Sequence, residues 1–301
     1  MKKIFALLFV VIVAVMPCRI YAQDVPLLVE IPTPPAQLER LDERCNYIVD
    51  NFWKRLNYKG AFSSLDRLEA TLGQFMSVTP YASADTVYMA INTLVKGVEK
   101  ADAKNLVTLA KMVEKLCGTD TSEYESEDLM LPFAQAVANC KKIKGPDKEY
   151  FTKMAKRLTN SRVGVIPADF SFTMPSGNTA NFSDIKDETV LIFFYDPNDF
   201  ESRLARTRLG NNYVIKTLGD YNMLRVVAIY PSAPDDTWLA DIESMPDNWV
   251  IGAAPGIDDM FTIRRMPQIY YLDGDRKITD KDFSADAAII YFDQFLKQQN
   301  Q

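Results

Sequence analysis

A polar segment at residues 196–202, Asp-Pro-Asn-Asp-Phe-Glu-Ser, directly follows the unbroken apolar run Val190–Tyr195. Its carboxylates could act as acid–base groups or as helix caps, and Asn198 with Glu201 has the spacing of a capping box. Asp199 offers a second cap. An apolar run rich in β-branched and aromatic residues predicts a strand buried on both faces. A central strand leading into a capped helix places this turn at the carboxyl end of a sheet, where α/β folds hold their chemistry.

The composition restricts what that chemistry can be, because the chain contains no histidine. This excludes Ser-His-Asp and Cys-His catalysis, zinc held by histidine and haem held by a proximal histidine. No cofactor and no metal site is therefore predicted. Any catalysis would depend on carboxylates, lysine, tyrosine or thiols.

The first 22 residues predict a secretory signal peptide. Lys2 and Lys3 precede an apolar run of roughly 13 residues, which ends before Ala22. That run is shorter than the roughly 20 residues of a transmembrane helix, and no later segment reaches this length without charges. A lipoprotein signal acylated at Cys18 is the alternative, but Pro17 occupies a position where such signals carry a small residue.

The remaining chain is acidic and carries three cysteines. The whole chain has a net charge of −6, and the signal segment contains three cations and no acid, so the rest carries −9. This balance disfavours nucleic acid and anionic membrane surfaces as partners. Cys45, Cys117 and Cys140 form no C-x-x-C motif, and their simplest role is as small buried side chains. In an antiparallel hairpin Cys117 and Cys140 would lie roughly 20 Å apart, beyond disulfide reach, while pairing of Cys45 with either stays open.

Residues 23–160 predict an all-α domain of unknown function. After a proline-rich lead-in, apolar residues recur at three- and four-residue steps in six segments separated by short links. The first helix is expected from Pro35 to the stop at Lys59-Gly60, with its apolar positions between Leu38 and Leu56. The apolar positions of the other five helices run over Leu65–Met76, Val87–Val98, Leu106–Leu116, Leu129–Cys140 and Tyr150–Leu158. The large aromatic side chains of these segments fall on the apolar faces and predict core positions; they are Phe52, Trp53, Phe75 and Phe133.

Residues 161–301 change to short alternating and apolar runs, which predict a second domain with a mixed sheet. Their order is a hairpin around Pro175–Asn178, the strand Val190–Tyr195, a helix over about Asp199–Leu218 and the strand Leu224–Tyr230. A helix, a short strand, a brief helix, a strand–turn–strand unit and a terminal helix follow. The predicted fold class is therefore α+β overall, with an all-α domain followed by an α/β domain.

This second half resembles the thioredoxin-like exported thiol-disulfide oxidoreductases related to TlpA and ResA. The resemblance spans about residues 162–298 and rests on four segments of the sequence. They are Pro167-Ala-Asp-Phe, Phe182-Ser-Asp-Ile-Lys-Asp, Val190-Leu-Ile-Phe-Phe-Tyr-Asp-Pro and Arg265-Met-Pro-Gln-Ile-Tyr-Tyr-Leu-Asp-Gly. The helical half resembles, more weakly, an uncharacterised domain found ahead of such modules in exported bacterial proteins. The resemblance implies a thioredoxin-like fold and a place in the periplasm or cell envelope.

The resemblance also implies an active site whose reactive residues are missing here. The C-x-x-C motif of the family falls at Asp199-Phe200-Glu201-Ser202, so Asp199 and Ser202 occupy the two cysteine positions. Thiol exchange needs a thiolate to attack and a second thiol to resolve the mixed disulfide. Pro267, preceded by Met266, matches the cis-proline that faces the family's active site.

These features predict a redox-inactive protein that binds a protein or peptide partner at the edge beside Pro267. No catalytic residue is assigned, and the oligomeric state is not indicated. Three alternatives remain: thiol exchange by the cysteines outside the motif, a structural or assembly role led by the helical domain, and hydrolysis by carboxylates. The carboxylates in question are Asp199, Glu201, Asp235, Asp236, Asp258 and Asp259.

Overall fold

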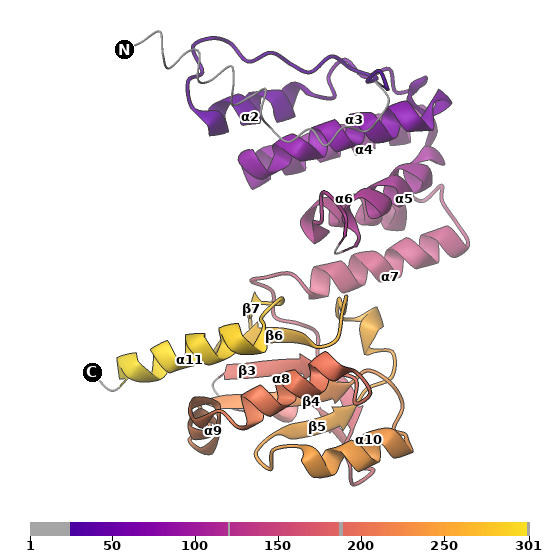
Figure 1. Cartoon of the computed structure of the whole chain (residues 1–301). Helices are drawn as coiled ribbons and strands as arrows, with labels where there is room; N and C mark the ends of the chain where they lie inside the picture. Colours follow the sequence, from indigo (N-terminus) through magenta and orange to yellow (C-terminus); the bar gives the residue numbers. More distant parts are fainter. Residues whose placement is uncertain (1–24, 120, 187–188, 300–301) are drawn as a thin grey trace, which may run out of the picture. The chain divides into compact units, whose positions relative to one another are not determined.

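The computed structural model describes residues 25–119, 121–186 and 189–299 of the chain (Figure 1). The predicted signal peptide, with Cys18, lies outside the described residues. The chain divides into two compact units, residues 1–105 and 106–301. Across the described residues, no helix combines the length and apolar character needed to cross a membrane.

The first unit is helical. Its elements are α2 (Leu41–Asn51), the 3-10 turns η1 (Ala61–Ser63) and η2 (Thr79–Tyr81), α3 (Leu65–Val78) and α4 (Ala84–Asp102). Its core contains the predicted aromatic residues Phe52, Trp53 and Phe75, each 1% exposed, with ring centroids 4.8–5.3 Å apart. The predicted lead-in packs on α3, where Arg67 donates to the carbonyls of Pro26 and Leu27.

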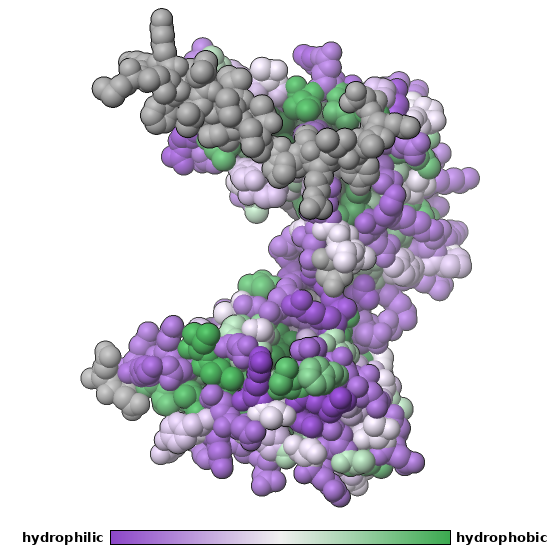
Figure 2. Space-filling model, in the orientation of Figure 1, coloured by the Kyte–Doolittle hydropathy of each residue, from purple (hydrophilic) through white to green (hydrophobic). Residues whose placement is uncertain are grey.

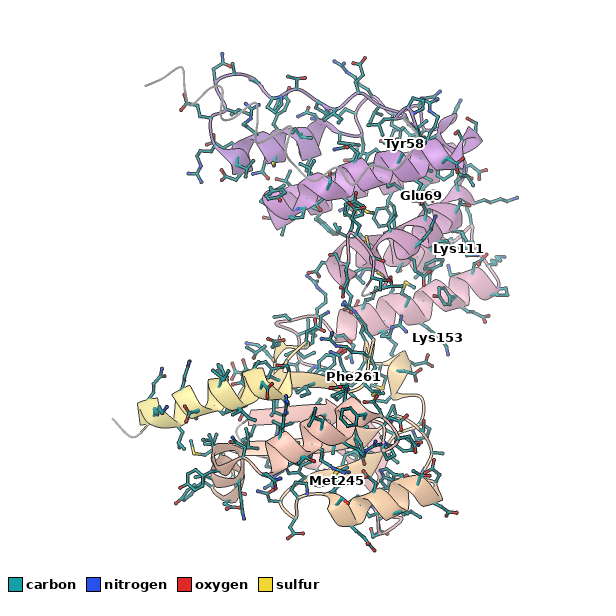
Figure 3. All side chains as sticks on the ribbon, in the orientation of Figure 1. Tyr58, Glu69, Lys111, Lys153, Met245 and Phe261 are labelled. Atoms are coloured by element: carbon teal, nitrogen blue, oxygen red, sulfur yellow. The ribbon has the colours of Figure 1, made fainter. Side chains whose placement is uncertain are left out.

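The first helix is shorter than predicted. Residues 35–38 form a turn, closed by the Leu38 amide on the Pro35 carbonyl. After Asn51 the chain continues in tighter turns, because the amides of Phe52 and Lys54 bond carbonyls three residues back. Tyr58, labelled in Figure 3, lies against Gly97 of α4, where a Cβ atom would collide with its ring.

The second unit combines three helices with a seven-stranded sheet. The helices are α5 (Asn105–Cys117), α6 (Glu127–Asn139) and α7 (Pro146–Asn160). The strands are β1 (Ser171–Thr173), β2 (Thr179–Asn181), β3 (Thr189–Phe194), β4 (Leu224–Tyr230), β5 (Val250–Ala253), β6 (Gln268–Leu272) and β7 (Ile278–Asp280). The remaining elements are α8 (Phe200–Gly210), α9 (Tyr213–Asp220), α10 (Asp236–Asp241), α11 (Ala285–Gln299) and the turns η3 (Phe182–Asp184), η4 (Ile242–Ser244) and η5 (Ile257–Asp259).

The sheet is mixed, as predicted, with strand order β2-β1-β5-β4-β3-β6-β7. Strand β3 pairs parallel with β4 and antiparallel with β6, so it lies inside the sheet. Its alternate residues enter two separate cores: Leu191 and Phe193 face α8, α9 and α11, whereas Val190, Ile192 and Phe194 face the opposite side. Phe261, labelled in Figure 3, fills that opposite core. The prediction of a strand buried on both faces is confirmed.

The single helix predicted over Asp199–Leu218 is wrong, because the chain forms two helices there. Helix α8 ends at Gly210, and Asn212 caps α9 by accepting hydrogen bonds from the amides of Val214 and Ile215. A side chain that satisfies two free amides is a strong start signal for a new helix. The sequence carries that signal as Gly210-Asn211-Asn212.

The helical part of the chain ends at Asn160, and the strands begin at Ser171. The compact units, however, meet at residues 105 and 106, which places α5 to α7 with the sheet. The predicted domain boundary at residue 160 stays a prediction.

Substituting Gly252 in β5 should destabilise the second unit. A Cβ atom there would lie on the Phe172 ring, closer than van der Waals contact, and Phe172 is 2% exposed. We expect Gly252→Ala to lower the free energy of unfolding by about 1–3 kcal/mol, measured by urea denaturation.

The double variant Phe172→Leu/Gly252→Ala tests the cause of that loss. If the ring is the obstacle, the double variant should be more stable than the sum of the two single losses implies, by about 0.5–3 kcal/mol. Additive losses would contradict this explanation.

Candidate functional site

The turn after β3 is organised by Asp199. This residue is the N-cap of α8, with φ −78° and ψ 130°, and its Oδ2 accepts a hydrogen bond from the Ser202 amide at 2.6 Å. A carboxylate at a helix N-terminus is stabilised by the helix dipole by about 0.3–1 kcal/mol. The predicted capping role of Asp199 is thus confirmed. Asn198 does not cap the helix: its own amide donates to Asp196 Oδ1 at 2.8 Å.

Ser202, which the family resemblance aligned with a cysteine, is not available to a ligand. Its side chain lies in the core of the turn, with the residue 1% exposed. Its Oγ accepts a hydrogen bond from the Asp196 amide at 3.3 Å, which ties the start of α8 back to the end of β3. Phe200, by contrast, is 64% exposed, and Glu201 is also exposed. The Asp199 and Ser202 side chains therefore both serve the local fold.

A cleft of about 320 Å³ lies beside this turn. It brings Glu201 together with Met266 and Pro267, and the peptide bond between the latter two is cis. Asp199, Phe200 and Ser202 do not line it. Its other lining residues come from α8, the loop before β6, β6 itself, the segment after β7 and the start of α11: Leu204, Ala205, Arg208, Arg265, Gln268, Ile269, Asp282, Phe283, Ser284, Ala285 and Asp286.

The cleft has an apolar floor, made by the half-buried Leu204 and the buried Ala205 and Ile269. Its two rims contain polar residues together with the half-buried Met266 and Phe283. On the rims, Arg208 pairs with Asp286 at 2.8 Å, and the Gln268 side chain, 3% exposed, donates to the Lys281 carbonyl and to Asp282 Oδ1. Such a surface suits a chain of alternating apolar and polar groups.

One side of the cleft also carries backbone groups that are not used by the fold. Within the described residues, the backbone N–H and C=O groups of Arg265 and Met266 make no hydrogen bond, and neither the Arg265 nor the Glu201 side chain has a polar partner. Backbone groups of this kind form hydrogen bonds with water or with an added strand.

The sequence did not indicate the rim at Asp282–Ser284. Those residues lie far along the chain from the turn after β3, and only the hairpin of β6 and β7 returns them to it. A local signal exists in Ser284, whose Oγ accepts from the Ala287 amide and begins α11. Apolar side chains are exposed along α11, as the green surface in Figure 2 shows, and they include Ile290 and Tyr291.

None of Cys45, Cys117 and Cys140 lines the cleft. All three are buried, and they are not joined by a disulfide among the described residues, so neither pairing of Cys45 occurs there. Burial raises the pKa of the Cys117 thiol to about 12, and burial likewise raises the pKa of Cys45. Thiols shifted in this direction hold little thiolate at neutral pH.

Two of the other acidic residues considered from the sequence, Asp235 and Asp259, have structural partners. Asp235 caps α10 and accepts a hydrogen bond from the Tyr230 hydroxyl at 3.1 Å. Asp259 pairs with Lys153 at 2.8 Å, and this ion pair lowers the pKa of the Asp259 carboxyl. No set of three or more Cys, Asp or Glu side chains within the described ranges is placed to bind a metal ion.

Comparison with solved structures identifies the fold. A thioredoxin-like protein from Bacteroides caccae matches with a TM-score of 0.68 at 18% identity, over 87% of this chain and 97% of that one. A conserved protein of unknown function from Bacteroides fragilis is 30% identical over 44% of this chain and 98% of that one, with a TM-score of 0.41. A thiol:disulfide interchange protein from Bacteroides sp. is 17% identical over 46% of this chain and 92% of that one, with a TM-score of 0.40.

No family model matches the chain, and no curated protein matches it. The first structural match spans most of both molecules, and its low identity limits what it shows to architecture. The strand order, the mixed sheet and this match together show that the chain has a thioredoxin-like fold.

Proposed function

We propose that this protein binds an extended polypeptide segment in the cleft between α8 and Arg265–Pro267, and that it does so without exchanging disulfides. The observation that carries this proposal is the unused backbone at Arg265 and Met266 beside an apolar floor. An incoming strand would pair with those backbone groups, and its alternate side chains would enter the cleft.

The loss of thiol chemistry is the second part of the proposal. The Asp199 carboxylate is engaged by the Ser202 amide, and the Ser202 hydroxyl is buried in the turn. The remaining cysteines are buried, and the pKa of Cys117 and Cys45 is raised. These features support recognition over catalysis, and they give no support to an enzyme that uses cysteines outside the motif.

Insulin reduction coupled to a dithiol should be no faster with this protein than without it. We expect the same uncatalysed rate for a variant in which Cys45, Cys117 and Cys140 are all replaced by alanine. Catalysis by the wild type that disappears in this variant would contradict the proposal.

The frame of the site can be tested by restoring thiols to it. The variant Asp199→Cys/Ser202→Cys places one thiol at the N-terminus of α8, where the helix end lowers a thiol pKa. We expect its insulin reduction to exceed the wild-type background by roughly tenfold or more. The single variant Asp199→Cys, which lacks a resolving thiol, is the matched control and should stay near background.

Peptide binding should depend on the open mouth of the cleft. Random decapeptides would be selected against the protein, and the Kd of a selected, labelled peptide measured by fluorescence anisotropy. Glu201→Trp places an indole at the mouth and should weaken binding roughly tenfold or more, a loss of about 1.4 kcal/mol.

Thr207→Trp is the matched control, because Thr207 is exposed on the same helix but does not line the cleft. It should leave Kd unchanged. The peptide would also be N-methylated at one position at a time. Methylation at every second position should abolish binding, since one edge of a strand uses every second amide. Equal Kd values for both tryptophan variants would contradict the site, and failure to select any peptide would favour a structural role.

Export to the periplasm or cell envelope is the remaining part of the proposal, and it rests on the basic, apolar and small-residue pattern of residues 1–22. Produced in a bacterial host, the full chain should be recovered from the periplasm with an N-terminus near Gln23. A variant lacking residues 2–22 should stay in the cytoplasm. An acylated Cys18 would instead show the lipoprotein alternative.

A further inference from the structure

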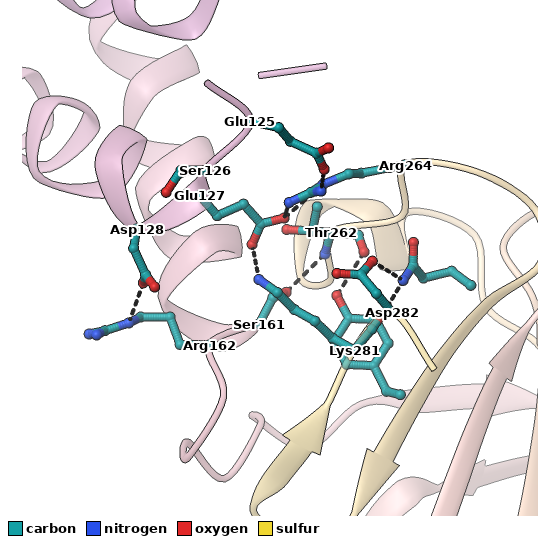
Figure 4. Close-up of polar contacts among 12 residues, drawn as sticks. Glu125, Ser126, Glu127, Asp128, Ser161, Arg162, Thr262, Arg264, Lys281 and Asp282 are labelled. Carbon is teal, nitrogen blue, oxygen red and sulfur yellow. Dashed lines mark hydrogen bonds and ion pairs between the residues drawn. The ribbon is translucent and has the colours of Figure 1, made fainter. Parts of the chain in front are cut away.

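A buried carboxylate on α6 joins that helix to two distant segments of the chain. Glu127, the first residue of α6, is 8% exposed. Its Oε1 accepts hydrogen bonds from Arg264 Nε at 3.1 Å and Nη2 at 2.7 Å, and its Oε2 accepts from Lys281 Nζ (Figure 4). Glu125 pairs with Arg264 as well. Both cations are largely enclosed, with side chains 20% and 17% exposed.

Each of the two cations directly precedes one rim of the cleft. Arg264 is followed by Arg265–Pro267, here called the proline rim, and Lys281 is followed by Asp282–Ala285, here called the α11 rim. The Gln268 side chain links the two, since it follows the proline rim and donates to Lys281 O and Asp282 Oδ1. One carboxylate therefore lies behind both rims without lining the cleft.

Other helical residues hold the same loop further back. Asn160 Nδ2 donates to the Met260 carbonyl at 2.9 Å, and Ser161 Oγ accepts from the Thr262 amide at 2.8 Å. Glu127 continues this series by binding Arg264. The loop is thus attached to the helices at every second residue from Met260 to Arg264, and the proline rim extends from the last attachment.

The Glu127 carboxyl is removed from water and faces charges of both signs. Burial raises its pKa, Lys281 acts to lower it, and the nearby Asp282 carboxylate acts to raise it. Buried ion pairs of this kind often add little to the free energy of unfolding, while a fixed geometry is one of their attested roles.

We infer that Glu127 is a positioning residue for the peptide cleft: by binding Arg264 and Lys281 together, it holds the proline rim and the α11 rim at the spacing an extended segment requires. The effect of Glu127 on peptide binding rests on the proposed function. It makes α6, a helix outside the strand-containing part of the chain, a part of the recognition site.

The test compares Glu127→Gln with Asp128→Asn in the full mature chain. Asp128 is the matched control, because it is the next residue of α6 and carries the same charge, but it is exposed and its ion pair, with Arg162 at 3.3 Å, involves neither Arg264 nor Lys281. Two NMR signals report the rims in the absence of any peptide. The Met266 methyl group reports the proline rim, and the Gln268 side-chain amide protons report its bonds to the α11 rim.

In Glu127→Gln we expect a lower Met266 methyl order parameter and roughly tenfold faster exchange of the Gln268 side-chain amide. The Kd of the selected decapeptide should rise by about 3- to 30-fold. Asp128→Asn should match the wild type in all three. Lys281→Met keeps the bonds between Glu127 and Arg264, so it should alter the Gln268 signal and leave the Met266 signal unchanged. If Glu127→Gln does not fold, Lys281→Met replaces it as the test variant.

Wild-type values of both signals in folded Glu127→Gln, or equal changes in Asp128→Asn, would overturn the inference. Altered signals with an unchanged Kd would also overturn it, since the rims would then move without effect on binding. If no decapeptide binds the wild type, the proposed function fails, and the two signals still decide whether Glu127 holds the rims.

Discussion

The burial of β3 on both faces is the constraint on which the second unit depends. Leu191 and Phe193 belong to one core, and Ile192 and Phe194 belong to the other, all with no exposure. A strand in this position can neither slip nor end early, because a shift of one residue would exchange its two faces. The direction in which the chain leaves the sheet is therefore set, and with it the start of α8.

That start has a positive electrostatic environment whatever residue occupies it, because the first amides of a helix lack partners within the helix. In a redox-active relative of this fold a thiolate would gain from it. Here the helix end stabilises the Asp199 carboxylate, whose Oδ2 accepts a hydrogen bond from the Ser202 amide of the same turn. The groups that the fold does not use lie on the neighbouring surface, at Glu201, Arg265 and Met266, and this is where we propose that a peptide binds.

Local signals were sufficient for β3 and for the Asp199 cap. The cis bond at Pro267 was implied by the family resemblance. The break between α8 and α9 was also local, and the paired asparagines at 211–212 could have revealed it. Glu127 could not be found in this way. It lies in an acidic stretch in which Glu123 and Glu125 are the same residue type and Asp128 follows directly, and its ion pair with Arg264 joins residues 137 positions apart.

Long-range dependence of this kind also explains why fold could be predicted here more readily than site. A buried strand can be predicted from its own run of apolar side chains. The cleft, in contrast, forms only where α8, the loop before β6 and the segment after β7 meet. The ion pairs of Glu127 lie where the second and third of these segments leave the helical layer. Displacement of either segment would change the cleft that we propose as the peptide site, and a fixed geometry is an attested role of buried ion pairs.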